Sequence, residues 1–232
     1  TLAVTINQVV APAAAAETRG TTWGDGLTAG RTLDLSEFHI AKPGDSVQSI
    51  NSQLARGKNL LLTPGVYDIN RSIDIKRPGT VVLGMGHATL TAVNGATPIT
   101  VWDRAGIVVA GVTIDAGLKN SQVLMQVGAD RPRNPAQGST LANPVTLSDV
   151  YFRVGGPHIG KADVSLQIDA DNVLVDHTWV WRADHGVEGF TGPNEGDSQR
   201  WATNTGRNGL IVNGDDVTAT GLFVEHYQEH NT

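Results

Sequence analysis

The chain has 232 residues, of which 27 are glycine, 40% are hydrophobic and 17% are charged, so it is globular rather than disordered. Its formal net charge of −6 argues against a nucleic-acid partner, because no Lys/Arg cluster is present to neutralise a phosphate backbone. The absence of cysteine excludes disulfide scaffolds, thiolate metal sites and cysteine nucleophiles. A neutral polysaccharide suits this charge balance better than a polyanion.

The first segment, Leu2–Ala16 (LAVTINQVVAPAAAA), is apolar and ends in small residues. It can be the remnant of a secretory signal with a cleavage site near Ala16, or an Ala-rich leader. We therefore expect residues 1–20 to be flexible and the protein to be secreted. No run of 18 or more apolar residues follows, so we expect no membrane partner.

A single helix is predicted within Pro43–Lys58 (PGDSVQSINSQLARGK), where Val47, Ile50 and Leu54 have helical spacing. Asp45 or Ser46 can serve as its N-cap. The helix immediately precedes the first strong strand signal. We expect it to cover the open end of the structure that follows.

The rest of the chain repeats one pattern, in which short alternating apolar runs are separated by Gly, Asn or Asp. The runs are Asn59–Ile69, Thr80–Leu90, Ile99–Asp115, Val145–Val154, Leu166–Trp181 and Leu210–Glu225. Such alternation predicts strands with one face buried. Successive units start roughly 20 to 25 residues apart where no loop intervenes, which is the period of a solenoid coil.

An ordinary β-sandwich also has short strands at regular spacing. However, Asn-Gly and Asp-Gly hairpin signals are largely absent between the paired runs, and the turns are single small polar residues. We therefore predict an all-β fold, a right-handed parallel β-helix with a short N-terminal capping helix. Residues 21–232 are expected to be the N-terminal portion of one β-helix domain. The segment 226–232 follows a strand directly, which suggests further coils beyond it.

Two polar insertions, Gly128–Asn143 and Gly186–Asn208, interrupt the repeats. Loops of this length are often functional. In a solenoid we expect them to emerge from one face and form the walls of a groove.

Acidic residues bracket the second insertion. Asp184 follows the strand that ends at Trp181, and Asp215 and Asp216 follow the strand that ends at Val212. If these turns lie on neighbouring coils about 4.8 Å apart, the three carboxylates converge. Glycoside hydrolysis uses such carboxylates as acid and base. Asp and Asn are also common at turns for purely structural reasons.

The sequence around these acids, ADHG followed by NGLIVNGDDVTATGLFVEH, resembles the bacterial α-1,3-glucanases and mycodextranases of glycoside hydrolase family 87. An Asp after one strand and Asp-Asp after the next also looks like the acidic triad of polygalacturonase-type β-helix hydrolases. The family 87 resemblance implies an inverting α-glucanase with Asp184, Asp215 and Asp216 as its catalytic group. In that mechanism we expect Asp215 to be the acid and the other two to hold the water.

Substrate-binding candidates lie near the same turns: His185, His226, Arg182 and Trp201. We prefer Trp201 over Trp179 and Trp181, because aromatic residues that share one strand face are more often in the core. No metal-site motif is present, and we expect no metal, no cofactor and a monomer. Three alternatives remain open: a polysaccharide lyase, a pectin-type hydrolase, and a β-helix that binds carbohydrate as an adhesin without catalysis.

Overall fold

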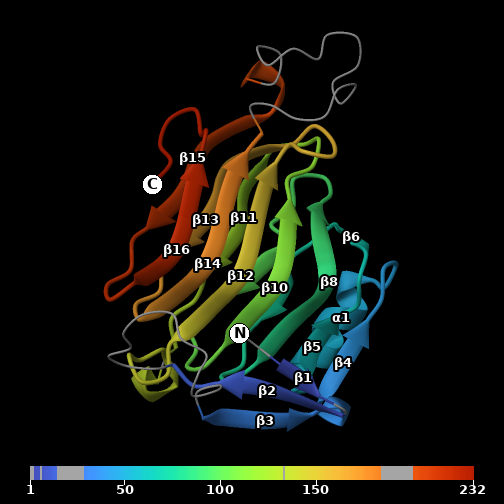
Figure 1. Ribbon diagram of the computed structural model, residues 1–232, viewed down its shortest axis with the longest axis vertical. Helices are drawn as coiled ribbons and strands as arrows, with labels where there is room; N and C mark the ends of the chain where they lie inside the picture. Colours follow the sequence, from blue (N-terminus) through green and yellow to red (C-terminus); the bar gives the residue numbers. More distant parts are fainter. Residues whose placement is uncertain (1–2, 6, 15–28, 133, 184–200) are drawn as a thin grey trace.

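The computed structural model describes residues 3–5, 7–14, 29–132, 134–183 and 201–232 (Figure 1). Two parallel sheets form the body of the molecule, and the chain alternates between them from β8 onward. The eight-stranded sheet contains β4 (Phe38–Ala41), β5 (Asn59–Leu62), β6 (Val66–Ile69), β8 (Val81–Ala92), β10 (Val108–Asp115), β12 (Val145–Val154), β14 (Val173–Arg182) and β16 (Thr218–Glu225). The five-stranded sheet contains β7 (Ile73–Ile75), β9 (Ile99–Val101), β11 (Ser121–Val127), β13 (Lys161–Ile168) and β15 (Thr205–Val212). This arrangement confirms the predicted right-handed parallel β-helix.

The coils are longer than the sequence pattern suggested. Val108 pairs with Val81 one coil earlier, and Ile99 pairs with Ile73, so one coil takes 27 and 26 residues at these points. Each coil carries one strand of each sheet, and some recognised runs, such as Ile99–Asp115, contain parts of both strands. The strands β7 and β11 lie outside the recognised runs and were not predicted.

The interior of the coil is filled by the inward side chains of both sheets. In β12, for example, Val145, Leu147, Val150, Phe152 and Val154 are fully buried. The alternation slips by one residue between Leu147 and Val150. The reason is that Asp149 has a positive φ of 54°, which bends the strand and restores the inward direction one residue later.

The predicted helix is confirmed as α1 (Val47–Ala55), and Ser46 is its N-cap, with its Oγ accepting from the backbone N–H of Ser49. Val47, Ile50 and Leu54 are buried in the main core. The helix packs against β4, β5 and β7 (Figure 1), so it covers the first coils as expected.

Residues near the N-terminus belong to the fold. A small antiparallel sheet is formed by β1 (Ala3–Thr5), β2 (Gln8–Pro12) and β3 (Gly30–Asp34). Buried Val9 and Ala11 of β2 pack with Leu61 and Leu83, two residues of the eight-stranded sheet, in a second core. The expectation of a flexible leader over residues 1–20 is therefore not met between Gln8 and Pro12. Leu60–Leu62 is a continuous apolar run because β2 and β3 cover the outer side of this region.

The connections lie at two opposite ends of the sheets. The insertion at Gly128–Asn143 joins β11 to β12, where the strands of the eight-stranded sheet begin, and contains the short 3₁₀ helix η2 (Pro135–Gln137). The second insertion joins β14 to β15, where β14 ends, and β15 starts within it at Thr205. The described residues that flank the two insertions therefore lie at opposite ends of the strands and not at the one face that we expected, and residues 184–200 of the second insertion lie outside the described residues. A second 3₁₀ helix, η1 (Leu35–Glu37), connects β3 to β4.

Within the described residues, no helix has both the length and the apolar character to cross a membrane.

Candidate functional site

A column of left-handed residues runs across the middle of the eight-stranded sheet. Strand register places Gly111, Asp149, His177 and Gly221 side by side, with φ values of 70°, 54°, 52° and 57°. Glycine adopts this conformation at little cost, whereas other residues lose about 1–2 kcal/mol. Asp149 and His177 therefore occupy backbone conformations that glycine would adopt at a lower free-energy cost.

Beyond this column, aromatic side chains cover the outer side of three neighbouring strands. Tyr151, Trp179 and Phe223 are paired in register on β12, β14 and β16. Trp179 is 40% exposed and Phe223 is 62% exposed. The Trp181 ring stacks on that of Trp179, with centroids 5.3 Å apart and planes 19° apart. We call these four residues the aromatic face. Exposed aromatic clusters of this kind mark binding surfaces.

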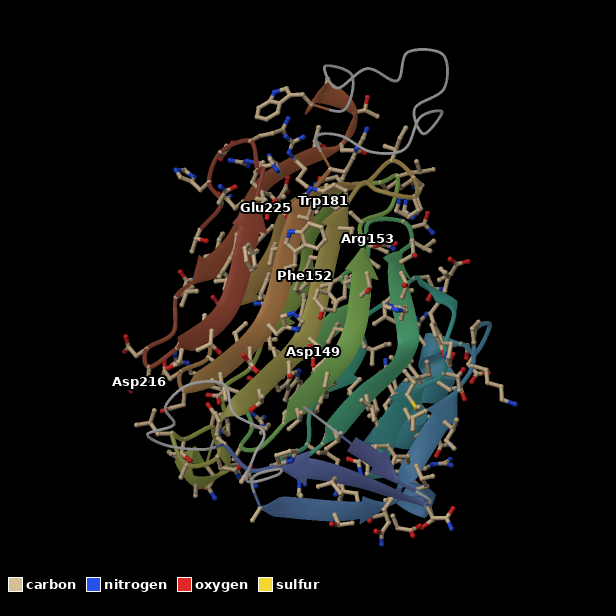
Figure 2. The ribbon with its side chains drawn as sticks, viewed as in Figure 1. Asp149, Phe152, Arg153, Trp181, Asp216 and Glu225 are labelled. Carbon is tan, nitrogen blue, oxygen red and sulfur yellow. The ribbon has the colours of Figure 1, made fainter. Side chains whose placement is uncertain are left out.

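A polar row borders the aromatic face near the ends of the strands. Asp115, Arg153, Trp181 and Glu225 are neighbours across β10, β12, β14 and β16, and Figure 2 shows the last three along the same edge. The Arg153 guanidinium donates two 2.7 Å hydrogen bonds to the Asp115 carboxylate, whose side chain is only 3% exposed. Glu225 is 37% exposed and lies 3.4 Å from His226 Nε2.

The left-handed column carries a second polar group, around Asp149. Asp149 Oδ1 lies 2.5 Å from His177 Nδ1 and accepts a 3.4 Å hydrogen bond from the Tyr151 hydroxyl. Burial, followed by the Asp149 charge, raises the pKa of Tyr151 above its usual range. The phenol therefore stays protonated at neutral pH and can donate. Figure 2 places Asp149 midway along β12, on the side toward the viewer.

The turn that carries Asp215 and Asp216 lies far from the described residues that precede Asp184. Asp215 and Asp216 lie in the exposed turn before β16, where the Asp215 backbone N–H donates to Asp171 Oδ1 and the Asp215 carbonyl accepts from Asn172. That turn stacks beside the start of β14. Arg182 and Ala183, which precede Asp184, lie at the other end of this ten-residue strand, about 30 Å away at the usual rise per residue. Asp184 itself lies outside the described residues.

The separation between the end of β14 and the turn before β16 has a simple physical reason. The strands before the two turns belong to different sheets: β14 to the eight-stranded sheet and β15 to the five-stranded sheet. In a β-helix, turns stack only on turns of the same kind. The sequence interpretation treated two different kinds of turn as equivalent.

Three of the four predicted binding residues do come together, at the end of β14. Arg182 is fully buried and donates to the carbonyls of His226 and Asn204, the latter at 3.1 Å. Trp201 is 51% exposed, and its ring centroid lies 4.3 Å from the guanidinium carbon of Arg182. Arg182 therefore holds the chain together instead of facing a substrate, while Trp201 and His226 remain accessible. His185 lies outside the described residues.

The aromatic face itself was missed. Trp179 and Trp181 were assigned to the core because they share one strand face, and that inference was wrong for Trp179. The available signal was the slip in alternation at His177, which turns the odd-numbered positions from inward in Val173 and Val175 to outward in Trp179 and Trp181. Tyr151 follows the same slip after Asp149.

This surface combines apolar rings with a hydrogen-bond acceptor, which is chemistry that can recognise a sugar. Aromatic rings offer apolar faces with polar edges, and the Glu225 carboxylate at the edge can accept hydrogen bonds from hydroxyl groups. Among the described residues, no group of three or more His, Cys, Asp and Glu side chains is placed to hold a metal ion. Asp115 and Glu225 are three strand spacings apart, about 14 Å, which exceeds the 6.5–9.5 Å of an inverting pair of carboxyl groups.

The fold and this surface define a β-helix of the pectate-lyase-like class. A family model described as the LAM55 pectate lyase-like domain matches residues 38–232, and the chain belongs to this family. It is 43% identical over 224 residues to an exo-β-1,3-glucanase of Streptomyces sp. (strain SirexAA-E / ActE). That match covers 97% of this chain and 35% of the relative.

Two solved structures of a protein named sacteLam55A, from Streptomyces sp. SirexAA-E, are also similar. One has a TM-score of 0.83 at 42% identity, and the other, a variant in complex with glucose, has a TM-score of 0.84 at 43% identity. Each match covers 98% of this chain and 39% of the solved chain. The chain thus spans little more than a third of the length of these relatives.

These findings correct the earlier family assignment. The resemblance to glycoside hydrolase family 87 was wrong, and so was the α-glucan substrate that it implied. The motifs ADHG and GDD misled because Gly, Asp and Asn recur at the turns of any β-helix, where backbone geometry selects them.

Proposed function

We propose that this chain is part of an exo-β-1,3-glucanase, a glycoside hydrolase, and that its aromatic face binds the β-1,3-glucan. The observation that carries the proposal is the 43% identity to an exo-β-1,3-glucanase over 97% of this chain. The glucose complex of the similar solved structure supports a carbohydrate ligand. A secreted protein suits a polymeric substrate of this kind, since such a polymer is met outside the cell.

The aromatic face suits a binding role. Tyr151, Trp179 and Phe223 lie on adjacent strands about 4.8 Å apart, so successive rings follow one line across the sheet. A sugar chain lying along this line can bury its apolar ring faces against them, while Glu225 accepts hydrogen bonds from hydroxyls at one edge. Apolar surface that is removed from water in this way contributes about 25 cal/mol per Å².

Hydrolysis itself requires a proton donor and a base that activates water. Asp115 is committed to Arg153 and lies too far from Glu225 for that pairing. We therefore propose that the described part of the chain positions the glucan. The inverting hydrolysis is assigned to the whole protein that contains this chain. No cofactor enters this chemistry.

The test is an assay of the protein that contains this chain on laminarin, α-1,3-glucan and pectate. We expect glucose to be released from laminarin alone, and NMR of the first product to show the α-anomer, as inversion requires. Release of reducing sugar from α-1,3-glucan but not from laminarin would overturn the proposal. Ultraviolet-absorbing unsaturated products from pectate would point to a lyase.

A pair of matched variants tests the role of the aromatic face. Trp179→Ala removes an exposed ring from the face, whereas Trp102→Ala removes an indole that contacts Lys76 and Arg104 elsewhere on the coil. We expect Trp179→Ala to raise KM for laminarin about 3- to 10-fold and Trp102→Ala to leave it unchanged. Equal KM values for the two variants would remove the face from substrate binding.

A further inference from the structure

We propose that a hollow beside the aromatic face, between a bulge of β8 and the Asp149–Tyr151 pair of β12, is a binding subsite for a single sugar ring. The inference deepens the proposed function, and it rests on that function for the identity of the sugar. The hollow has a volume of about 330 Å³ and is lined by Gly84, Gly86, His87, Gly111, Asp149 and Tyr151, among others. This volume is at the lower end of the range for ligand pockets.

The bulge creates the hollow. Leu83 pairs with Ala110 and Ala88 pairs with Val112, so the four residues from Gly84 to His87 face the single residue Gly111. The extra residues of β8 leave the ladder, and His87 adopts a left-handed φ of 61° at the end of the bulge. The bulge forms one rim of the hollow, and β10 forms its floor.

Glycine sets the position of the floor. A Cβ atom on Gly84 would lie 2.4 Å from the Gly111 carbonyl oxygen, and one on Gly111 would lie 2.5 Å from the Gly84 carbonyl oxygen. Glycine is therefore required at both positions for this close approach of β8 and β10, which places the bulge beside the hollow.

The opposite rim supplies the polar groups. The Asp149 side chain is 34% exposed. Its Oδ1 is engaged by His177 and Tyr151, and its Oδ2 accepts a 3.3 Å hydrogen bond from Ser148. A carboxylate has about four acceptor positions, and three are taken by His177, Tyr151 and Ser148, so capacity remains for one ligand hydroxyl. The Tyr151 ring adds an apolar wall that is continuous with the aromatic face.

This combination selects a neutral polyol. The lining residues include no Lys or Arg, and the Asp149 charge disfavours phosphate, sulfate or carboxylate ligands. A sugar ring supplies the two complementary features, which are hydroxyl donors for the carboxylate and C–H groups for the tyrosine ring. The backbone at Asp149 is left-handed, and its side chain lines the hollow.

The experiment is calorimetric titration of the protein with laminaribiose and laminaritriose, using two variants of the hollow. Asp149→Asn keeps a residue that tolerates the left-handed backbone and removes the charge. Thr113→Phe fills the hollow from β10. Asp163→Asn, on β13 of the other sheet, is the matched control. Unchanged thermal unfolding midpoints establish that the variants are folded, and if Thr113→Phe does not fold, Asp149→Asn decides.

We expect Asp149→Asn to weaken binding about 10- to 100-fold, as the loss of one charge-assisted hydrogen bond implies. Thr113→Phe should weaken binding at least as much, because the ring occupies the space of the ligand, and the control should bind normally. Normal affinity in Asp149→Asn and Thr113→Phe would overturn the subsite and leave the proposed function intact. If the unmodified protein neither binds these sugars nor hydrolyses laminarin, the proposed function fails. The subsite is then decided with cellobiose and nigerose: binding that the variants abolish supports it, and no binding overturns it.

Discussion

The ion pair between Arg153 and Asp115 allows a sharp test of how the coil is held together. Two 2.7 Å hydrogen bonds join a carboxylate that is 3% exposed to a guanidinium that is 33% exposed. Replacing Arg153 by Ala leaves the buried carboxylate without its partner. We expect the free energy of unfolding to fall by about 3–5 kcal/mol, the range for breaking a buried pair from one side.

The assay is urea unfolding followed by circular dichroism, in which a lower midpoint at an unchanged slope reports a loss of stability. Arg207→Ala is the control, because the Arg207–Glu229 pair has similar geometry, with N–O distances of 2.9 and 3.2 Å, but is exposed on both sides. Solvent screening should make that variant nearly neutral.

A double variant separates the pair from the individual side chains. Replacing Asp115 by Asn together with Arg153 by Met should cost less than the sum of the two single changes, with a coupling of about 1–3 kcal/mol. Additive effects, or an Arg153→Ala variant no less stable than Arg207→Ala, would refute the reasoning.

Three further predictions concern packing, backbone and pH. Phe152→Ala, at a fully buried position, should lower the free energy of unfolding by about 3–5 kcal/mol in the urea assay, and a loss below about 1 kcal/mol would contradict the tight core. Gly111→Ala should destabilise more than Gly44→Ala: both positions have positive φ, but only Gly111 has a carbonyl oxygen within 2.5 Å of the added Cβ, so equal midpoints would contradict the close approach. Burial is the first cause that raises the pKa of Tyr67, Tyr151 and Tyr227, so the folded state holds their protons more tightly than the unfolded state. Their contribution to the free energy of unfolding is fully present below the ordinary pKa of 10.0 and is lost as the pH rises above it. In an absorbance titration, we therefore expect phenolate to form together with unfolding.

Much of the fold was predictable because its causes are local. Alternating apolar residues specify strands with one buried face, as in β12, whose observed bounds are those of the predicted run. The spacing of Val47, Ile50 and Leu54, with Ser46 before them, specified α1 and its N-cap. The absence of hairpin signals excluded antiparallel pairing between most successive strands.

The candidate site was much less predictable. Which face of β14 is outward depends on the left-handed backbone at His177, and the slip in alternation there does not by itself show the backbone conformation that causes it. The hollow beside β8 depends on a register shift between β8 and β10, which exists only once the two strands are paired. The acids Asp215 and Asp216 were predicted to lie close to Asp184 because their turns were assigned to neighbouring coils, whereas the two turns follow strands of different sheets.

The sequence by itself thus determined the class of fold, since the period of apolar residues and the turn chemistry act within a few residues. Only the tertiary structure decided which turns stack on one another and which aromatic side chains face solvent. The physical reason is that coil length and strand register set the distances between residues from different coils. One bent residue per strand is enough to exchange the inner and outer faces.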